Sequence, residues 1–150
     1  MADTDDRWPA EMRGARRANA IRPGYDELVR VAEADVRVYR PADAIELVAE
    51  PGVRFVDVRE AVELDGGVIP GAVHASRGLL EAHLDPATSR YVRELGGAAA
   101  LVCYCAGGSR SALAAQRARE LGIDRVGHLA GGIAAWRDAG GAIRAIEDRR

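Results

Sequence analysis

Lysine is absent from this 150-residue chain, and all 21 of its basic side chains are arginines. A mechanism that needs a lysine amine, as a Schiff base or as a general base, is therefore excluded. Neither sign of charge is in marked excess, because the formal net charge is -2. The composition thus gives no reason to expect binding to nucleic acid or to an anionic membrane.

Cysteines and long apolar runs are also scarce. No stretch approaches the roughly 20 apolar residues that a membrane span needs. The first six residues are acidic and polar, whereas a signal peptide has a basic start followed by an apolar run. The only two cysteines, Cys103 and Cys105, lie too close in sequence to clip a fold together. We therefore expect a cytoplasmic protein with free thiols.

Metal-ligand spacing is not present either. The three histidines, His74, His83 and His128, are scattered along the chain and form no ligand pattern with the cysteines. The prediction is that the protein needs no metal and no organic cofactor.

Strand-like and helix-like segments alternate over most of the chain. Strands are predicted at 36–39, 53–58, 72–75, 98–104 and 125–129, and helical segments at 41–50, 77–94, 109–121 and 131–139. The alternation predicts a three-layer α/β/α domain with a mainly parallel sheet. Ligands of such sheets bind beyond the carboxyl ends of the strands, where Asp57 and Cys105 fall.

The main domain is predicted to span residues 37–142. Before it, residues 1–22 are charged and are expected to form a flexible segment, and residues 23–36 are expected to form an amphipathic helix. This helix either packs on the domain or contacts a second copy of the chain, so both a monomer and a homodimer remain open. Residues 143–150 are expected to be a polar tail.

The most informative stretch brings Cys105 from an apolar strand into a short loop, after which a helix begins at Ser109 or Ser111. The loop residues Ala106, Gly107, Gly108 and Ser109 are small, and their amides can turn inward to form a nest for an anion. The helix N-terminus and Arg110 add positive charge. This setting favours the reactive thiolate of Cys105 without a histidine base. The alternative is a buried structural cysteine at a strand end.

Four segments together resemble the rhodanese-like sulfurtransferase family. Cys105–Ser111 resembles the family's active-site loop, and Phe55–Glu60 its Asp-x-Arg strand end. Gly67–His74 resembles the Gly-His-Ile-Pro-Gly-Ala segment, and Leu129–Trp136 the closing Gly-Gly-x-x-x-Trp segment. The four segments occur in the same order as in the family, between about residues 36 and 140. The sequence departs from the family pattern at Val68, where the family often has histidine.

The resemblance implies a five-stranded sheet and a sulfurtransferase that carries sulfane sulfur as a persulfide on Cys105. The donor would be a small molecule such as thiosulfate, and the acceptor cyanide or a thiol. Arg110 would attract the anionic donor and stabilise the thiolate, while the amides of residues 106–110 would surround the persulfide. This is covalent catalysis by an activated cysteine.

Two other functions stay open. One is a redox-sensing or protein-binding module that retains the fold. The other is a cysteine-dependent phosphatase or arsenate reductase, which loop length disfavours. Four residues separate Cys105 from Arg110, whereas related phosphatases have five, and the smaller ring of amides suits a single sulfur better than a phosphoryl group.

The remaining candidates receive supporting or structural interpretations. Asp57 and Arg59 are predicted to support the loop rather than to touch substrate. Cys103 is interpreted as a core thiol, with a resolving thiol or one half of a metal pair as alternatives. His74 is interpreted as a packed or surface residue and Trp136 as core, while Gly131 and Gly132 permit a tight turn.

Overall fold

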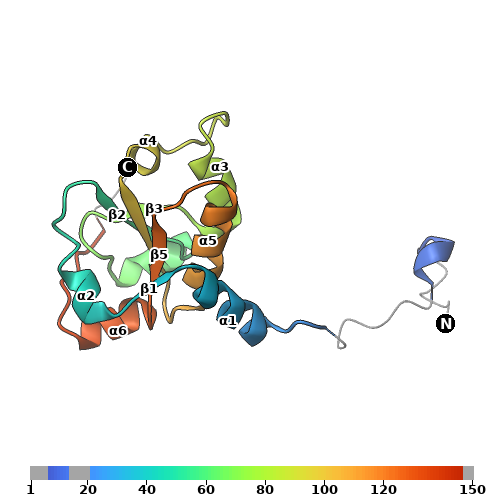
Figure 1. Ribbon diagram of the computed structural model, residues 1–150, viewed down its shortest axis with the longest axis horizontal. Coiled ribbons are helices and arrows are strands. Elements are labelled where there is room, and N and C mark those ends of the chain that lie inside the picture. Colours follow the sequence, from blue (N-terminus) through green and yellow to red (C-terminus); the bar gives the residue numbers. More distant parts are fainter. Residues whose placement is uncertain (1–6, 14–20, 147–150) are drawn as a thin grey trace.

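The computed structural model describes residues 7–13 and 21–146 of the chain. Two parts of the predicted flexible segment (residues 1–6 and 14–20) and the last part of the predicted polar tail (residues 147–150) lie outside the described residues. Within residues 7–13 the structure has a short 3-10 helix, η2 (Ala10–Met12). The elements that follow from residue 25 onward form the folded domain (Figure 1).

A five-stranded sheet forms the centre of the domain, as predicted. Its strands are β1 (Arg37–Tyr39), β2 (Val53–Asp57), β3 (Val73–His74), β4 (Ala100–Tyr104) and β5 (Val126–Leu129). Their order is β1-β5-β4-β2-β3, and every neighbouring pair is parallel. Because parallel strands end at the same edge, the carboxyl ends of β2 and β4 bring Asp57 opposite Tyr104.

Helices cover both faces of this sheet, which confirms the predicted three-layer α/β/α fold (Figure 1). One face is covered by α1 (Tyr25–Asp35), α3 (Leu80–Leu84), α4 (Arg93–Gly96) and α5 (Ser109–Glu120). The opposite face is covered by α2 (Pro41–Ile45) and α6 (Gly132–Asp138). The predicted N-terminal helix packs on the domain, with α1 lying against α5.

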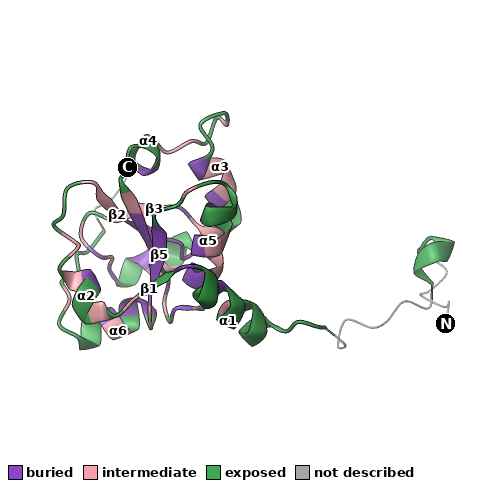
Figure 2. Ribbon diagram, in the orientation of Figure 1, coloured by how far each residue is buried: buried purple, intermediate pink, exposed green. Residues whose placement is uncertain are grey.

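The strands separate two buried apolar cores. Along β4, Leu101 and Cys103 point into the core under α5, whereas Val102 and Tyr104 point into the core under α6. This alternation follows from the two-residue period of a strand. Figure 2 shows β4 and β5 largely buried at the centre, whereas the edge strand β1 is mostly exposed. Trp136 is completely buried in the second core, as predicted.

Two local elements differ from the prediction. Residues 61–66, for which no helix or strand was predicted, form a 3-10 helix, η4 (Ala61–Gly66). The helix expected to reach Pro51 ends instead at Ile45, and the amides of Leu47 and Glu50 bond to carbonyls three residues back. A proline disfavours the α conformation at the residue before it, which opposes helix through Glu50.

The predicted helical stretch 77–94 is broken into separate turns. It contains the 3-10 helix η5 (Arg77–Leu79), then α3, and only later α4. The chain after α6 returns to the domain, because Arg144 and Val68 exchange two backbone hydrogen bonds of 2.8 Å each. Among the described residues, no helix combines the length and apolarity that crossing a membrane requires.

Candidate active site

Cys105 lies directly after β4 and is 1% exposed. Its Sγ accepts a hydrogen bond from the backbone N–H of Gly108 at 3.1 Å and lies 3.4 Å from Ser111 Oγ. The loop therefore aims the Gly108 amide at the sulfur, and the first turn of α5 places the hydroxyl of Ser111 beside it.

Gly108 ends the loop in a left-handed conformation with φ of +107° and is the N-cap of α5. The helix begins at Ser109, but no side chain among the described residues caps it. Glycine adopts this conformation without the steric cost that a Cβ brings. A Cβ here would also lie 3.0 Å from the backbone nitrogen of Gly131. This glycine is thus needed both for the turn and for the approach of α6.

The carbonyl groups of the loop are held by the start of α6. The carbonyl of Cys105 accepts from the Ile133 amide at 2.9 Å, and that of Ala106 accepts from the Ala134 amide at 3.3 Å. Gly132 makes this contact possible, since a Cβ on it would lie 2.4 Å from the carbonyl oxygen of Ala106. The Gly131-Gly132 pair therefore fixes the loop in addition to turning the chain.

Arg110 was expected to stabilise the Cys105 thiolate. Among the described residues, no hydrogen bond joins its guanidinium to the Cys105 sulfur. Its guanidinium makes two hydrogen bonds, of 2.7 and 2.9 Å, to the carboxylate of Glu63 in η4. This pair lowers the pKa of Glu63 to about 2 and raises the pKa of Arg110.

Glu63 was missed by the sequence interpretation. It belongs to a capping box with Glu60, whose backbone N–H donates to the Glu63 carboxylate at 2.8 Å. The spacing of two glutamates three residues apart is the sequence signal that could have indicated a helical turn here. Its partner Arg110 is 47 residues away, and no local pattern indicates that contact.

Asp57 and Arg59 form a buried ion pair at the carboxyl end of β2. The Arg59 guanidinium donates to both carboxylate oxygens of Asp57 at 2.8–3.3 Å, and also to the backbone carbonyls of Glu63 and Gly67 at 3.1 and 2.9 Å. It also lies over the Tyr104 ring, with its carbon 5.7 Å from the ring centre. The pair ties η4 and Gly67 to the end of β2, and its predicted support of the Cys105 loop stays a prediction.

His74 and Cys103 occupy the places expected of packed residues. Nε2 of the half-buried His74 is 2.8 Å from the carbonyl oxygen of Arg59. Cys103 is 1% exposed, and burial raises the pKa of its thiol to about 12. At neutral pH Cys103 is therefore a neutral core thiol.

His128 was also missed, because the sequence analysis weighed this histidine only as a metal ligand. It lies on β5, is 1% exposed, and has Nδ1 3.0 Å from Ser111 Oγ. Burial lowers its pKa. The polar groups around the sulfur therefore include a histidine that reaches it through a hydroxyl.

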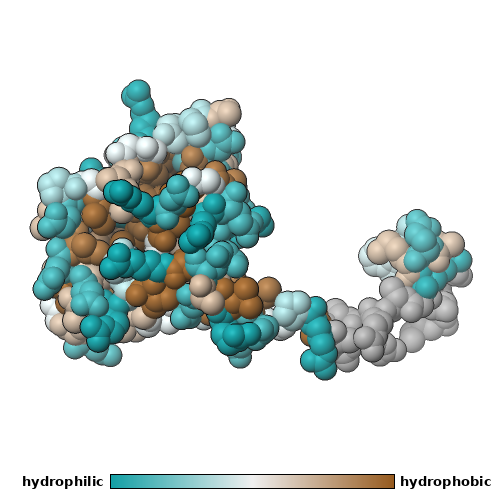
Figure 3. Space-filling model, in the orientation of Figure 1, coloured by the Kyte–Doolittle hydropathy of each residue, from teal (hydrophilic) through white to brown (hydrophobic). Residues whose placement is uncertain are grey.

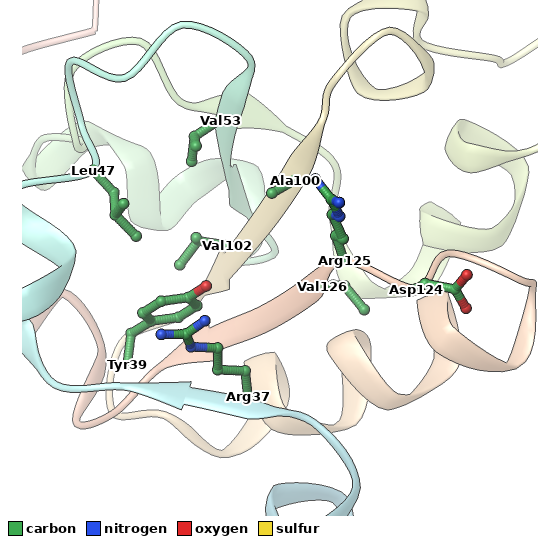
Figure 4. Close-up of a pocket in the computed structure, with 9 residues that line it drawn as sticks. All are labelled: Arg37, Tyr39, Leu47, Val53, Ala100, Val102, Asp124, Arg125 and Val126. Carbon is green, nitrogen blue, oxygen red and sulfur yellow. The ribbon is translucent and has the colours of Figure 1, made fainter.

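A hollow of about 460 Å³ lies at the other end of the sheet (Figure 4). The residues that line it include Val53, Ala100 and Val126, which begin β2, β4 and β5. In Figure 3 apolar surface is exposed over this part of the sheet, with hydrophilic side chains lying across it. Cys105 follows the opposite end of β4, so this hollow is separate from the candidate active site.

Comparison with known proteins places this chain in a family. The family model described as the Rhodanese-like domain matches residues 40–139. A protein of unknown function from Rhodopseudomonas palustris, described as a possible tyrosine phosphatase, is 37% identical with a TM-score of 0.80, and the match covers 86% of this chain and 100% of that one.

Two solved structures are described as sulfur transferases. A thiosulfate sulfurtransferase from Pseudomonas aeruginosa is 25% identical with a TM-score of 0.62, over 73% of this chain and 19% of that one. A polysulfide-sulfur transferase homodimer from Wolinella succinogenes is 27% identical with a TM-score of 0.59, over 84% and 90%. Together with the family match and the Cys105 loop, these similarities show that the chain belongs to the family of rhodanese-like domains.

Proposed function

We propose that this protein is a sulfurtransferase that moves sulfane sulfur from a small anionic donor such as thiosulfate, through a persulfide on Cys105, to cyanide or a thiol. The observation that carries the proposal is the short loop around Cys105, with the Gly108 amide donating to Sγ at 3.1 Å. A hydrogen-bond donor aimed at sulfur favours the thiolate over the thiol and also suits an anionic persulfide.

The reaction has two balanced steps. The Cys105 thiolate attacks the outer sulfur of thiosulfate; a new S–S bond forms, the S–S bond of thiosulfate breaks, and its electron pair leaves with sulfite. The acceptor then attacks the terminal sulfur of the persulfide, and the Cys105 thiolate leaves. Both steps follow the rules of nucleophilic attack at sulfur, in which the thiolate is the reactive form.

Arg110 and Glu63 are proposed to control the entry of the donor. Arg110 is the cation closest to the loop in sequence, and Glu63 already occupies its hydrogen-bonding edge. An anionic donor that binds Arg110 must therefore compete with an internal carboxylate. Asp57 and Arg59 are proposed to support the loop from behind, without contact to the donor.

A phosphatase is the second candidate, because the Rhodopseudomonas palustris relative is described as a possible tyrosine phosphatase. The four-residue spacing between Cys105 and Arg110 favours sulfur over a phosphoryl group, whose three equatorial oxygens need more donors. A redox-sensing or protein-binding module would need no sulfur transfer at all.

Mass spectrometry tests the proposal directly. The protein is incubated with thiosulfate, and peptides containing Cys105 are examined for the mass of one added sulfur atom. A sulfurtransferase gains this mass and loses it when cyanide is added. Hydrolysis of an aryl phosphate is measured in parallel, and turnover of the phosphate without persulfide formation would support the phosphatase instead.

A further inference from the structure

A chain of three buried polar side chains extends from the sulfur into the protein. Cys105 Sγ is 3.4 Å from Ser111 Oγ, and Ser111 Oγ is 3.0 Å from His128 Nδ1. Cys105 and His128 are each 1% exposed and Ser111 is completely buried. Burying a polar group without a hydrogen bond raises the free energy of the folded state. The direction of each hydrogen bond among these three side chains therefore has chemical consequences.

The parallel sheet brings these residues together. β5 lies beside β4, and His128 is the direct cross-strand partner of Cys103. Since paired residues share a face of the sheet, His128 points with Cys103 toward α5. The first turn of α5 carries Ser111, which therefore lies between His128 and the loop.

The other ring nitrogen of His128 decides which tautomer is favoured. Nε2 is buried and has no hydrogen-bond partner within the described part of the chain. Because burial lowers the pKa of His128, the imidazole is neutral and carries one N–H and one lone pair. Buried N–H groups without an acceptor are rarer than under-satisfied acceptors, so the proton belongs on Nδ1 and the lone pair on Nε2.

This tautomer sets the direction of the Ser111 hydroxyl. With a proton on Nδ1, His128 donates to Ser111 Oγ, and the hydroxyl proton of Ser111 is left to point at Cys105 Sγ. Together with the Gly108 amide, the sulfur then has two donors, the arrangement that suits a thiolate. With the opposite tautomer Ser111 would donate to His128, and the sulfur would have to donate to Ser111 as a neutral thiol.

We propose that His128 is a positioning residue that acts through Ser111 and holds the hydroxyl of Ser111 as a donor to the thiolate of Cys105. This inference concerns the ionisation of Cys105. It rests on the proposed function only in assigning that thiolate to sulfur transfer.

Other titratable or charged groups lie around Cys105, Ser111 and His128 and must be held constant in a test. They are Glu33 on α1, Cys103 on β4, Arg77 in η5, and Arg110 on α5 with its partner Glu63. On β1 the residue paired with His128 is the uncharged Val38. None of these groups is changed in the comparison below except Cys103.

The experiment measures the rate of alkylation of Cys105 by iodoacetamide as a function of pH. All variants carry Cys103→Ala, so that only Cys105 reacts. Ser111→Ala removes the hydroxyl, and His128→Leu removes the donor behind it while retaining an apolar side chain of similar size. Each of these variants is expected to move the midpoint of the alkylation profile upward by about one to two pH units, the size expected for one hydrogen bond to a charged group.

Two further variants separate positioning from packing. His128→Asn places a side-chain amide where Nδ1 lies and is expected to leave the midpoint near that of the parent. Val126→Ala is the matched control, because Val126 lies on the same strand, is 6% exposed and belongs to the same core as Cys105. Its midpoint is expected to stay with the parent, whatever it does to stability.

The double variant Ser111→Ala/His128→Leu gives the decisive comparison. If His128 acts through Ser111, the double variant shifts the midpoint no further than Ser111→Ala alone. Additive shifts, or an unchanged midpoint in Ser111→Ala, would overturn the proposal. If His128→Leu does not fold, His128→Asn decides in its place. A midpoint of His128→Asn raised as far as that of Ser111→Ala would then contradict positioning through a donor.

Failure of this proposal can be told apart from failure of the proposed function. Persulfide formation by the parent protein with unchanged midpoints in the variants would leave the sulfurtransferase intact and remove the role of His128. The predicted shifts without persulfide formation would leave the role of His128 intact and remove the sulfurtransferase.

Discussion

Gly132→Ala should lower both the stability and the rate of persulfide formation, because Gly132 is where α6 meets the Cys105 loop. Its φ is +63°, and a Cβ would lie 2.4 Å from the Ala106 carbonyl oxygen and 2.6 Å from that of Cys105. Both neighbours are backbone atoms, so no flexible side chain can move aside. The variant must separate α6 from the loop.

The magnitude has two parts. A left-handed conformation costs a residue with a Cβ about 1–2 kcal/mol. Separating α6 from the loop also weakens the hydrogen bonds from Ile133 and Ala134 to the loop carbonyls, at about 1 kcal/mol each. The sum, roughly 3–4 kcal/mol, corresponds to a fall in Tm of roughly 10 °C for a chain of this size.

Gly140→Ala is the matched control. Gly140 also has a positive φ, +83°, but nothing lies within 4 Å of its Cβ position. It should lose only the conformational part of the free energy, about 1–2 kcal/mol, and keep full persulfide formation. Thermal unfolding and the rate of persulfide formation from thiosulfate are measured for both variants. Equal losses of stability, or normal persulfide formation by Gly132→Ala, would refute the role given to this contact.

The remaining predictions concern individual side chains. Cys103→Ser should retain much of the activity, measured as thiocyanate formed from thiosulfate and cyanide, since Cys103 is a neutral core thiol; complete loss in a folded variant would show that it takes part in the reaction. Arg110→Ala should weaken the use of thiosulfate, seen mainly as a raised KM, and an unchanged KM would mean that the donor binds elsewhere. Glu63→Gln should lower the KM for thiosulfate by freeing Arg110, and a raised KM would show that the pair is needed intact. In Glu63→Gln the free energy of unfolding should also depend less on pH in the acid range. In the parent protein, folding lowers the pKa of the Glu63 carboxyl from 4.5 to about 2. This carboxyl therefore stabilises the parent fully above pH 4.5 and loses that effect as the pH falls toward 2. Urea unfolding between these pH values checks this, and parallel curves for parent and variant would contradict it.

Most of the fold could be predicted from the sequence because its signals are local. Apolar runs of strand length alternate with helical segments, and this alternation correctly predicted a mainly parallel sheet with helices on both faces, to which the family resemblance added the five strands. The position of Cys105 after β4 followed in the same way, since the strand is apolar and the loop begins with small residues. The helix α5 likewise began at Ser109, one of the two expected residues.

The contacts that complete the site could not be predicted, because they join residues far apart in sequence. Arg110 meets Glu63 across 47 residues, and Ser111 meets His128 across 17. A glutamate in a segment without a predicted element and a histidine in an apolar strand carry no local sign of their partners. Only the register of β4 against β5 and the packing of η4 beside the loop bring them to Cys105.

The central claim is that Cys105 carries sulfur, and mass spectrometry of the intact protein after brief thiosulfate treatment tests it most directly. The parent protein is predicted to gain one sulfur atom, to lose it on addition of cyanide, and to hydrolyse an aryl phosphate at a negligible rate. Cys105→Ser should gain no sulfur while keeping its fold. A folded Cys105→Ser protein that still takes up cyanide-labile sulfur, or a parent protein that hydrolyses the phosphate through Cys105 faster than it forms a persulfide, would contradict the account.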